Sequence, residues 1–357
     1  MTAMSGGVDS SVAAHVLAGW EDVEQEGAYI RTWQHEDNFF GDCPAGQEIE
    51  DARAVAEQVG VPFRVVNLVD HYREKVVDYL VRGYKAGITP NPDVHCNLEV
   101  KFGAFLDIAL EAGFEAVATG HYCRKRENPD GTHDIIEGAD KNKDQSYFLA
   151  LLRQDQLLRA LFPIGDIAKP EVREIARKAG FAIADKKDSQ GICFLGKVDI
   201  SEFLRARIPD NPGEILTHLG KVVGEHRGLH HYTLGQRKGI GVPSNTDNKA
   251  YVVVGKDAGR NHLLVAFDEP EAPIYVRRAT LGPISFTNRE VPGRVSLLAK
   301  PRYRDSSTPV ELVPESDGRT TVLFDEVQRA LAPGQVMALY DGEVLLGGGV
   351  YYSPAHG

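Results

Sequence analysis

The sequence predicts a doubly wound α/β domain with a parallel sheet, followed by strand-rich segments that end in a small all-β barrel or sandwich at the C-terminus. Segments of strand and helix character alternate through residues 1–196, which is typical of a parallel sheet covered by helices. A glycine turn joins the first strand directly to a helix. Beyond residue 197 helical periodicity fades, and residues 294–352 mostly alternate with a period of two. This change of pattern ends the first domain at residue 196.

The glycine turn, Ser5–Ser11, reads S-G-G-V-D-S-S and opens a helix with an apolar face. Glycines let the backbone approach a ligand, and the unpaired amides of the first helical turn favour an anion. The turn contains no lysine, so we expect amides, hydroxyls and a metal, rather than an ammonium group, to hold phosphate. Only Met1, Thr2 and Ala3 precede the turn proper, so either the first strand is very short or the true start codon lies upstream.

The remaining elements of the first domain follow in order. We expect strands at 27–33, 61–69 and 116–119, and helices at 48–60, 71–85 and 171–180. Ligands of such sheets bind at the carboxyl ends of the strands, where Gly120 and His121 follow the strand 116–119. Later segments predict a short helix at 203–207 and strands at 251–254, 262–266 and 274–281.

Two loops carry cysteines. Two prolines in 89–97 predict a rigid, extended loop around Cys96, which is either a support for reactive side chains or a plain surface connection. The second loop, 187–196, contains Cys193. Gly191–Lys197 fits G-x-x-x-x-G-K, but Val198 stands where Ser or Thr should bind Mg²⁺, which excludes a P-loop.

Composition limits the possible functions. The 357 residues include four cysteines without a C-x-x-C pair, which favours a reducing cytoplasm over a disulfide scaffold. No signal peptide or membrane span is recognisable. A zinc site at His121 and Cys123 is possible, but the paired ligand spacings are missing. The net charge of −11 argues mildly against nucleic acid, yet basic clusters at 169–187, 221–238 and 294–304 favour RNA.

Several motifs together resemble the tRNA-specific 2-thiouridylases, a family within the PP-loop ATP pyrophosphatase superfamily. The motifs span almost the whole chain and comprise Ser5–Ser11, Asn91–Asn97, Lys101–Gly103, Thr119–Tyr122, Lys143–Leu149, Asp188–Gly196 and Thr233–Gly239. The resemblance implies three domains: a PP-loop domain over 1–196, a small central domain over 197–270 and a C-terminal β-barrel over 271–357. It also implies a tRNA-uridine 2-sulfurtransferase that uses ATP and Mg²⁺. Such an enzyme adenylates the C2 oxygen of the wobble uridine in Lys, Glu and Gln tRNAs. A persulfide sulfur then gives 2-thiouridine, AMP and pyrophosphate.

The resemblance also implies roles for individual residues. Cys193 would carry the persulfide, Cys96 would resolve it through a Cys96–Cys193 disulfide, and Asp93 would act as acid and base. Asp9 would hold Mg²⁺. Asn91, Pro92 and Asp93 would contact the target base. The expected ATP contacts are Ala3, Met4, Ser5, Gly6, Gly7, Val8, Asp9, Ser10, Ser11, Ile30 and Gly120. The expected tRNA contacts are His121, Lys143, Asp144, Gln145, Arg302, Tyr303 and Gln335.

A relay protein or a cysteine desulfurase would supply the sulfur, and we expect a cytoplasmic monomer with no membrane contact. Two alternatives remain at this point. An ATP-dependent amidotransferase or synthetase would share Ser5–Ser11 but would need no paired loop cysteines. A non-catalytic tRNA-binding or sulfur-carrier protein would need no intact nucleotide loop.

Overall fold

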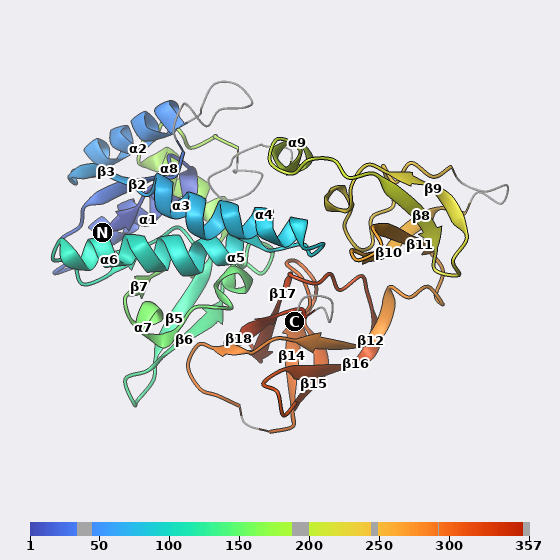
Figure 1. The fold of residues 1–357 in the computed structure, drawn as a ribbon. Coiled ribbons are helices and arrows are strands. Elements are labelled where there is room, and N and C mark those ends of the chain that lie inside the picture. Colours follow the sequence, from blue (N-terminus) through green and yellow to red (C-terminus); the bar gives the residue numbers. More distant parts are fainter. Residues whose placement is uncertain (34–44, 188–199, 244–248, 292, 353–357) are drawn as a thin grey trace.

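The computed structural model describes residues 1–33, 45–187, 200–243, 249–291 and 293–352, and shows an α/β domain and two β domains around a common junction (Figure 1). The α/β domain contains a parallel sheet of five strands in the order β3-β2-β1-β4-β7. Strand order reverses at the central β1, which confirms the doubly wound prediction. The strands are β1 (Thr2–Ala3), β2 (Gly27–Arg31), β3 (Phe63–Asn67), β4 (Val117–Ala118) and β7 (Ala160–Leu161).

Helices cover both faces of this sheet (Figure 1). Along β2, Ala28 and Ile30 face one apolar cluster and Tyr29 faces the other, because alternate side chains point to opposite faces of a strand. On the side of Tyr29 lie α1 (Val8–Ala18), α2 (Ala45–Val59) and α8 (Lys169–Lys178). On the other side lie α3 (Val69–Tyr72), α4 (Asp78–Lys85), α5 (Pro92–Cys96) and α6 (Phe105–Glu111), together with residues of α7 (Gln154–Leu158) and α9 (Ile200–Arg205).

The prediction of an extended loop over 89–97 is wrong for its second half. Pro92 is the first residue of helix α5, where a proline loses no helical hydrogen bond and its fixed φ suits the helix. The Asn91 side chain caps the helix, since its Oδ1 accepts the Val94 N–H at 3.2 Å. The sequence pattern of Asn-Pro therefore marked a helix start rather than a stiff connection.

The α/β domain and the C-terminal domain share a sheet, which the sequence did not reveal. A hairpin of β5 (Cys123–Glu127) and β6 (His133–Glu137) leaves the α/β domain, and β6 pairs with β18 in antiparallel register. The strand order is β12-β16-β15-β14-β17-β18-β6-β5, and β13 also pairs with β18. The C-terminal strands are β12 (Tyr275–Leu281), β13 (Ser285–Phe286), β14 (Val295–Lys300), β15 (Thr308–Pro314), β16 (Thr320–Arg329), β17 (Val336–Asp341) and β18 (Val344–Val350).

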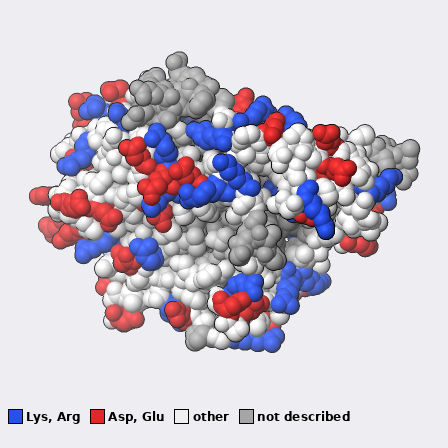
Figure 2. Space-filling model, in the orientation of Figure 1, with Lys and Arg blue, Asp and Glu red and all other residues white. Residues whose placement is uncertain are grey.

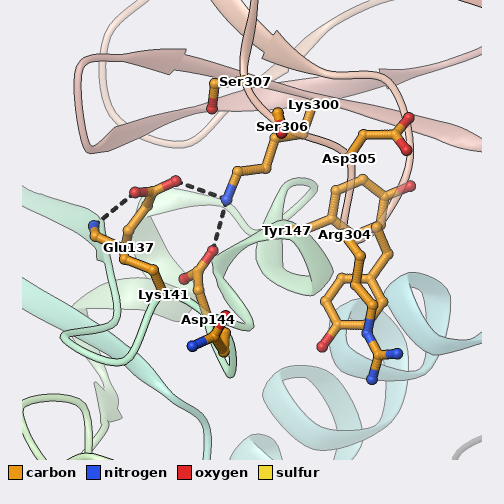
Figure 3. A pocket seen from close by; sticks show the side chains of 11 residues that line it. Glu137, Lys141, Asp144, Tyr147, Lys300, Arg304, Asp305, Ser306 and Ser307 are labelled. Atoms are coloured by element: carbon orange, nitrogen blue, oxygen red, sulfur yellow. Dashed lines mark hydrogen bonds and ion pairs between the residues drawn. The ribbon is translucent and has the colours of Figure 1, made fainter.

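A buried ionic cluster joins the two domains beside this shared sheet (Figure 3). Lys300 Nζ lies 2.7 Å from Glu137 Oε1 and 2.8 Å from Asp144 Oδ2, and these three side chains are no more than 14% exposed. Burial acts to lower the pKa of Lys300, but hydrogen bonds to Asp144 and Glu137 outweigh it and raise that pKa. The cluster lines a hollow of about 350 Å³, whose other walls include Tyr303 and Arg304.

We expect Lys300→Met to lower the free energy of unfolding by about 3 kcal/mol, because two buried carboxylates would lose their shared counter-ion. Thermal unfolding of the full chain measures this effect. Lys238→Met, at an exposed position, is the matched control and should change the midpoint little. An unchanged midpoint for Lys300→Met would show that the cluster contributes nothing net to stability.

The central domain has its own small core and a four-stranded sheet in the order β10-β11-β8-β9. Its strands are β8 (Gly213–Thr217), β9 (Val222–His226), β10 (Tyr251–Asp257) and β11 (His262–Phe267). A 3-10 turn, Leu229–His231, contacts both α4 and α9 and so connects this domain to the α/β domain. Among the described residues, no helix has the length and apolar character needed to cross a membrane.

Candidate nucleotide and sulfur-transfer site

The glycine turn between β1 and α1 is closed by its own serines. Ser10 Oγ accepts the Ser5 N–H at 3.1 Å and donates to the Gly7 carbonyl at 3.2 Å, and Ser11 Oγ donates to the same carbonyl at 2.9 Å. Gly6 has φ +69°, and a Cβ there would lie 2.5 Å from the Glu48 carbonyl oxygen. The turn is thus held in one shape at the N-terminus of an eleven-residue helix, where anions are favoured.

Gly120 lies against this turn, at the carboxyl end of β4. A Cβ on Gly120 would be 2.7 Å from the Ser10 backbone nitrogen, so only glycine permits this approach. Of the other expected ATP contacts, Met4 is 1% exposed and Ile30 is 3% exposed. These two side chains form part of the core next to the turn.

The largest difference from expectation is an ammonium group at the turn. Lys169, the first residue of α8, places Nζ 2.6 Å from Asp9 Oδ1, and the Tyr122 hydroxyl donates to the same oxygen at 2.7 Å. The Lys169 side chain is only 9% exposed. From the sequence we expected no ammonium group at this turn, and the structure places one beside Asp9. A residue distant in sequence supplies the lysine, and only the start of a helix marks it in the sequence.

A second lysine, Lys186, lies in the segment that follows α8 and binds this segment to the glycine turn. Lys186 Nζ donates to the Gly6 carbonyl at 2.9 Å and to Asp51 Oδ2 at 2.8 Å. Burial acts to raise the pKa of Asp51, but the hydrogen bond from Lys186 helps to bring it below its usual value. The chain that leads to Cys193 therefore starts beside the glycine turn. Cys193 itself lies outside the described residues, as does Cys43.

The helix α5 carries the other expected catalytic residues. Asn91 is its N-cap and is 8% exposed, Asp93 lies in its first turn, and Cys96 is its last residue and fully buried. Gln335, an expected tRNA contact, instead donates from Nε2 to the carbonyls of Thr89 at 2.8 Å and Pro90 at 3.1 Å. The C-terminal domain thus braces the segment that enters α5.

Most expected tRNA contacts near β4 and β5 already have partners inside the protein. His121 is 7% exposed, its Nδ1 lies 2.8 Å from Thr119 Oγ1, and burial, with Lys101 nearby, lowers its pKa well below the usual value. Asp144 is buried and accepts hydrogen bonds from Gly138, Ser146 and Lys300. Gln145 Oε1 accepts the Tyr122 N–H at 3.0 Å, and Lys143 is half-buried.

Arg302 and Tyr303 lie at the edge of the C-terminal domain. Arg302 Nε donates to Asp305 at 2.9 Å, and its guanidinium also donates to the Arg329 carbonyl at 3.0 Å. The Tyr303 ring lies 4.2 Å from the Phe148 ring, between centroids. Figure 2 shows Lys and Arg side chains on all three domains where they border the middle of this face. Of the three basic clusters, 221–238 belongs to the central domain and 294–304 to the C-terminal domain, and Figure 1 shows both of these domains at the junction with the α/β domain.

A zinc site at His121 and Cys123 finds no support in the described residues. Cys123 is buried in β5, where burial, with Asp144 nearby, raises the pKa of its thiol well above the usual value. A thiol in that state is a poor metal ligand. In the described ranges, a group of three metal-ligating side chains occurs at Asp210, His230 and His231, and it includes neither residue.

Three models of known protein families match three successive parts of the chain, which correspond to the three domains of the structure. Residues 1–197 match the family model described as "tRNA methyl transferase HUP domain", residues 201–267 the "tRNA methyl transferase PRC-barrel domain", and residues 276–351 the "Aminomethyltransferase beta-barrel domain". A protein of Akkermansia muciniphila named "tRNA-specific 2-thiouridylase MnmA" is 51% identical over 99% of this chain and 98% of its own length. Proteins of the same name from Lysinibacillus sphaericus and Streptococcus mutans are 46% and 44% identical over 97% of this chain and 92% and 93% of theirs.

Proposed function

The chain belongs to the tRNA-specific 2-thiouridylase family, and we propose that it replaces the C2 oxygen of a tRNA uridine with sulfur in an ATP-dependent reaction. The observation that carries this proposal is the closed glycine turn with Asp9, Lys169 and Tyr122 at its mouth. We further propose that the target is the wobble uridine of Lys, Glu and Gln tRNAs, and that the enzyme works as a cytoplasmic monomer with an external sulfur donor.

The first step activates a poor electrophile. The uracil C2 oxygen attacks the α-phosphorus of ATP, pyrophosphate leaves, and the oxygen becomes part of AMP, a good leaving group. Amides of the turn and the Lys169 ammonium lie where a triphosphate would bind, which supports this step. Asp9 offers the oxygen ligand that Mg²⁺ prefers, and Mg²⁺ when bound would neutralise charge on the pyrophosphate.

The second step needs a strong sulfur nucleophile and a second thiol. We propose that the terminal sulfur of a Cys193 persulfide adds to C2 and that AMP departs with the oxygen. In one route the Cys96 thiolate cleaves the S–S bond during transfer, which leaves a Cys96–Cys193 disulfide for an external thiol to reduce. In the other, the Cys96 thiolate first attacks the inner sulfur of the persulfide, which forms the same disulfide and releases hydrosulfide, and the hydrosulfide then attacks C2. Asp93, in the first turn of α5, would move the proton.

Mass spectrometry of tRNA from a deletion strain, and of tRNA treated with the purified enzyme, tests the proposal. Loss of 2-thiouridine in the strain and its appearance in vitro, with one AMP formed per sulfur, are the expected results. A product that gains a methyl group instead would favour methyl transfer, the activity in two of the family-model descriptions. ATP cleavage without tRNA thiolation would favour an amidotransferase or a synthetase.

Binding of tRNA should depend steeply on salt, because basic side chains displace counterions from phosphates. We expect Arg302→Ala to weaken tRNA binding and to reduce the slope of log Kd against log salt by about one, with ATP affinity unchanged. Arg289→Ala, with a 66% exposed side chain in the same domain, is the matched control. A dissociation constant that is unchanged in Arg302→Ala, measured by filter binding, would remove Arg302 from the tRNA surface.

A further inference from the structure

The central domain contains a cluster of two histidines and one carboxylate that the sulfur-transfer reaction does not use. Asp210 Oδ1 lies 2.6 Å from His231 Nε2 and 3.7 Å from His230 Nε2. One potential ligand atom from each of the three residues lies within 4.8 Å of the other two. In a tetrahedral zinc site with bonds of about 2.0 Å to nitrogen and oxygen, ligand atoms are roughly 3.3 Å apart. Small side-chain rotations would bring the three atoms to that spacing.

The histidines are buried and have unsatisfied nitrogen atoms. The side chains of His230 and His231 are only 5% and 4% exposed, whereas Asp210 is 40% exposed. His230 Nε2, which faces Asp210, and His231 Nδ1 have no hydrogen-bond partner. A buried nitrogen without a partner costs free energy, and a bound cation would satisfy His230 Nε2 directly. The exposed side of Asp210 leaves a path for an ion and a position for water.

The surrounding backbone fixes this arrangement. Gly228 precedes the turn, and a Cβ there would lie 2.7 Å from His230 Cε1 and 3.2 Å from the Asn211 nitrogen. The turn Leu229–His231 therefore packs directly on the segment that carries Asp210. The two imidazole rings are 4.0 Å apart, between centroids, although the residues are neighbours in sequence.

Charge near the cluster is compatible with a cation. Asp210 places a carboxylate next to the two imidazoles. Two basic groups, His226 and Lys256, also influence His230. Burial lowers the pKa of both, and that of Lys256, about 8, leaves it mostly protonated at pH 7, a repulsion that the carboxylate of Asp210 opposes.

We propose that Asp210, His230 and His231 bind a divalent transition-metal ion of the zinc class. The ion would tie the turn Leu229–His231, which contacts α4, to the segment that follows α9. It would thereby hold the central domain against the α/β domain. Two imidazoles with one carboxylate suit zinc better than calcium or magnesium, which prefer oxygen ligands alone.

Metal titration of the full-length chain tests this proposal. The chain is stripped with a chelator and titrated with Zn²⁺ while thermal unfolding is followed, and with Co²⁺ while visible absorption is followed. We expect one ion per chain at this site, a higher unfolding midpoint with Zn²⁺, and a tetrahedral Co²⁺ spectrum. Asp210→Asn and His231→Gln should weaken binding by more than about tenfold. His218→Gln, at an exposed histidine of the same domain, should bind as the wild type does.

Metal bound by cysteine would be unaffected by these substitutions, so equal binding in Asp210→Asn, His231→Gln and the wild type would overturn the proposal. No binding by the wild type would overturn it equally. Asp210→Asn changes a partly exposed side chain and keeps a group that can hydrogen-bond to His231. Its circular dichroism without metal should match that of the wild type. The test does not depend on tRNA thiolation.

Discussion

Asp9→Ala is expected to cut tRNA-dependent pyrophosphate release to less than about one hundredth of the wild-type rate, because the turn would lose its only acidic side chain. Since Lys169 is buried beside Asp9, this variant would also leave an ammonium without its counter-ion. Some loss of stability is therefore expected in addition. Asp9→Asn, which can still bond to Tyr122, separates the two effects. It should unfold closer to the wild-type midpoint and still fail to release pyrophosphate.

Lys169→Met tests the residue that sequence reasoning missed. We expect a fall of roughly a hundredfold in kcat/KM for pyrophosphate release, and a higher Mg²⁺ concentration for half-maximal nucleotide binding, because Asp9 would lose the group that orients it. Lys178→Met lies on the same helix with its side chain 75% exposed and is the control. If Lys169→Met released pyrophosphate at the wild-type rate and kept the same Mg²⁺ dependence, the lysine would serve only to stabilise α8.

The parts of the site that depend on local sequence could be predicted. The turn Ser5–Ser11 is held by hydrogen bonds between residues at most five apart. Its geometry can therefore be predicted from the motif alone. The strand that ends before Gly120 could also be located, since a doubly wound sheet brings strand ends together. Lys169 could not, because its contact with Asp9 joins residues 160 positions apart and depends on how α8 packs.

Contacts between residues far apart in the sequence also explain the other features that the sequence did not predict. The hairpin β5–β6 was missed because its strands are only five residues long and mostly polar, with β6 held in place by β18 from the far end of the chain. Gln335, an expected tRNA contact, binds the carbonyls of Thr89 and Pro90 before α5, and the sequence could not reveal a contact between residues 245 and 246 positions apart. A motif identifies which residue matters, but it does not distinguish a residue that contacts the substrate from one that supports the loop beside it.

The second large effect is expected from substituting two cysteines, Cys193 and Cys96. Cys193→Ser is expected to take up no sulfur and to form no 2-thiouridine, while still adenylating tRNA, because only Cys193 would carry a stable persulfide. Cys96→Ser should load sulfur on Cys193 but stop after that step, since no thiol would cleave the S–S bond. Cys96 ends α5 and is fully buried, which would protect its thiol until the partner sulfur arrives.

Intact-protein mass spectrometry after incubation with a persulfide donor measures the gain of one sulfur atom, and peptide mapping locates it. Cys43→Ser and Cys123→Ala are the controls and should remain active. The Cys123 thiol, with its raised pKa in β5, has too little thiolate to take part. If the Cys193→Ser variant still thiolated tRNA, or if the added sulfur mapped to Cys96, the roles proposed for the two cysteines would be wrong. Lys186, which precedes the Cys193 segment in the chain, donates to the Gly6 carbonyl of the turn where we expect the adenylated uridine to form.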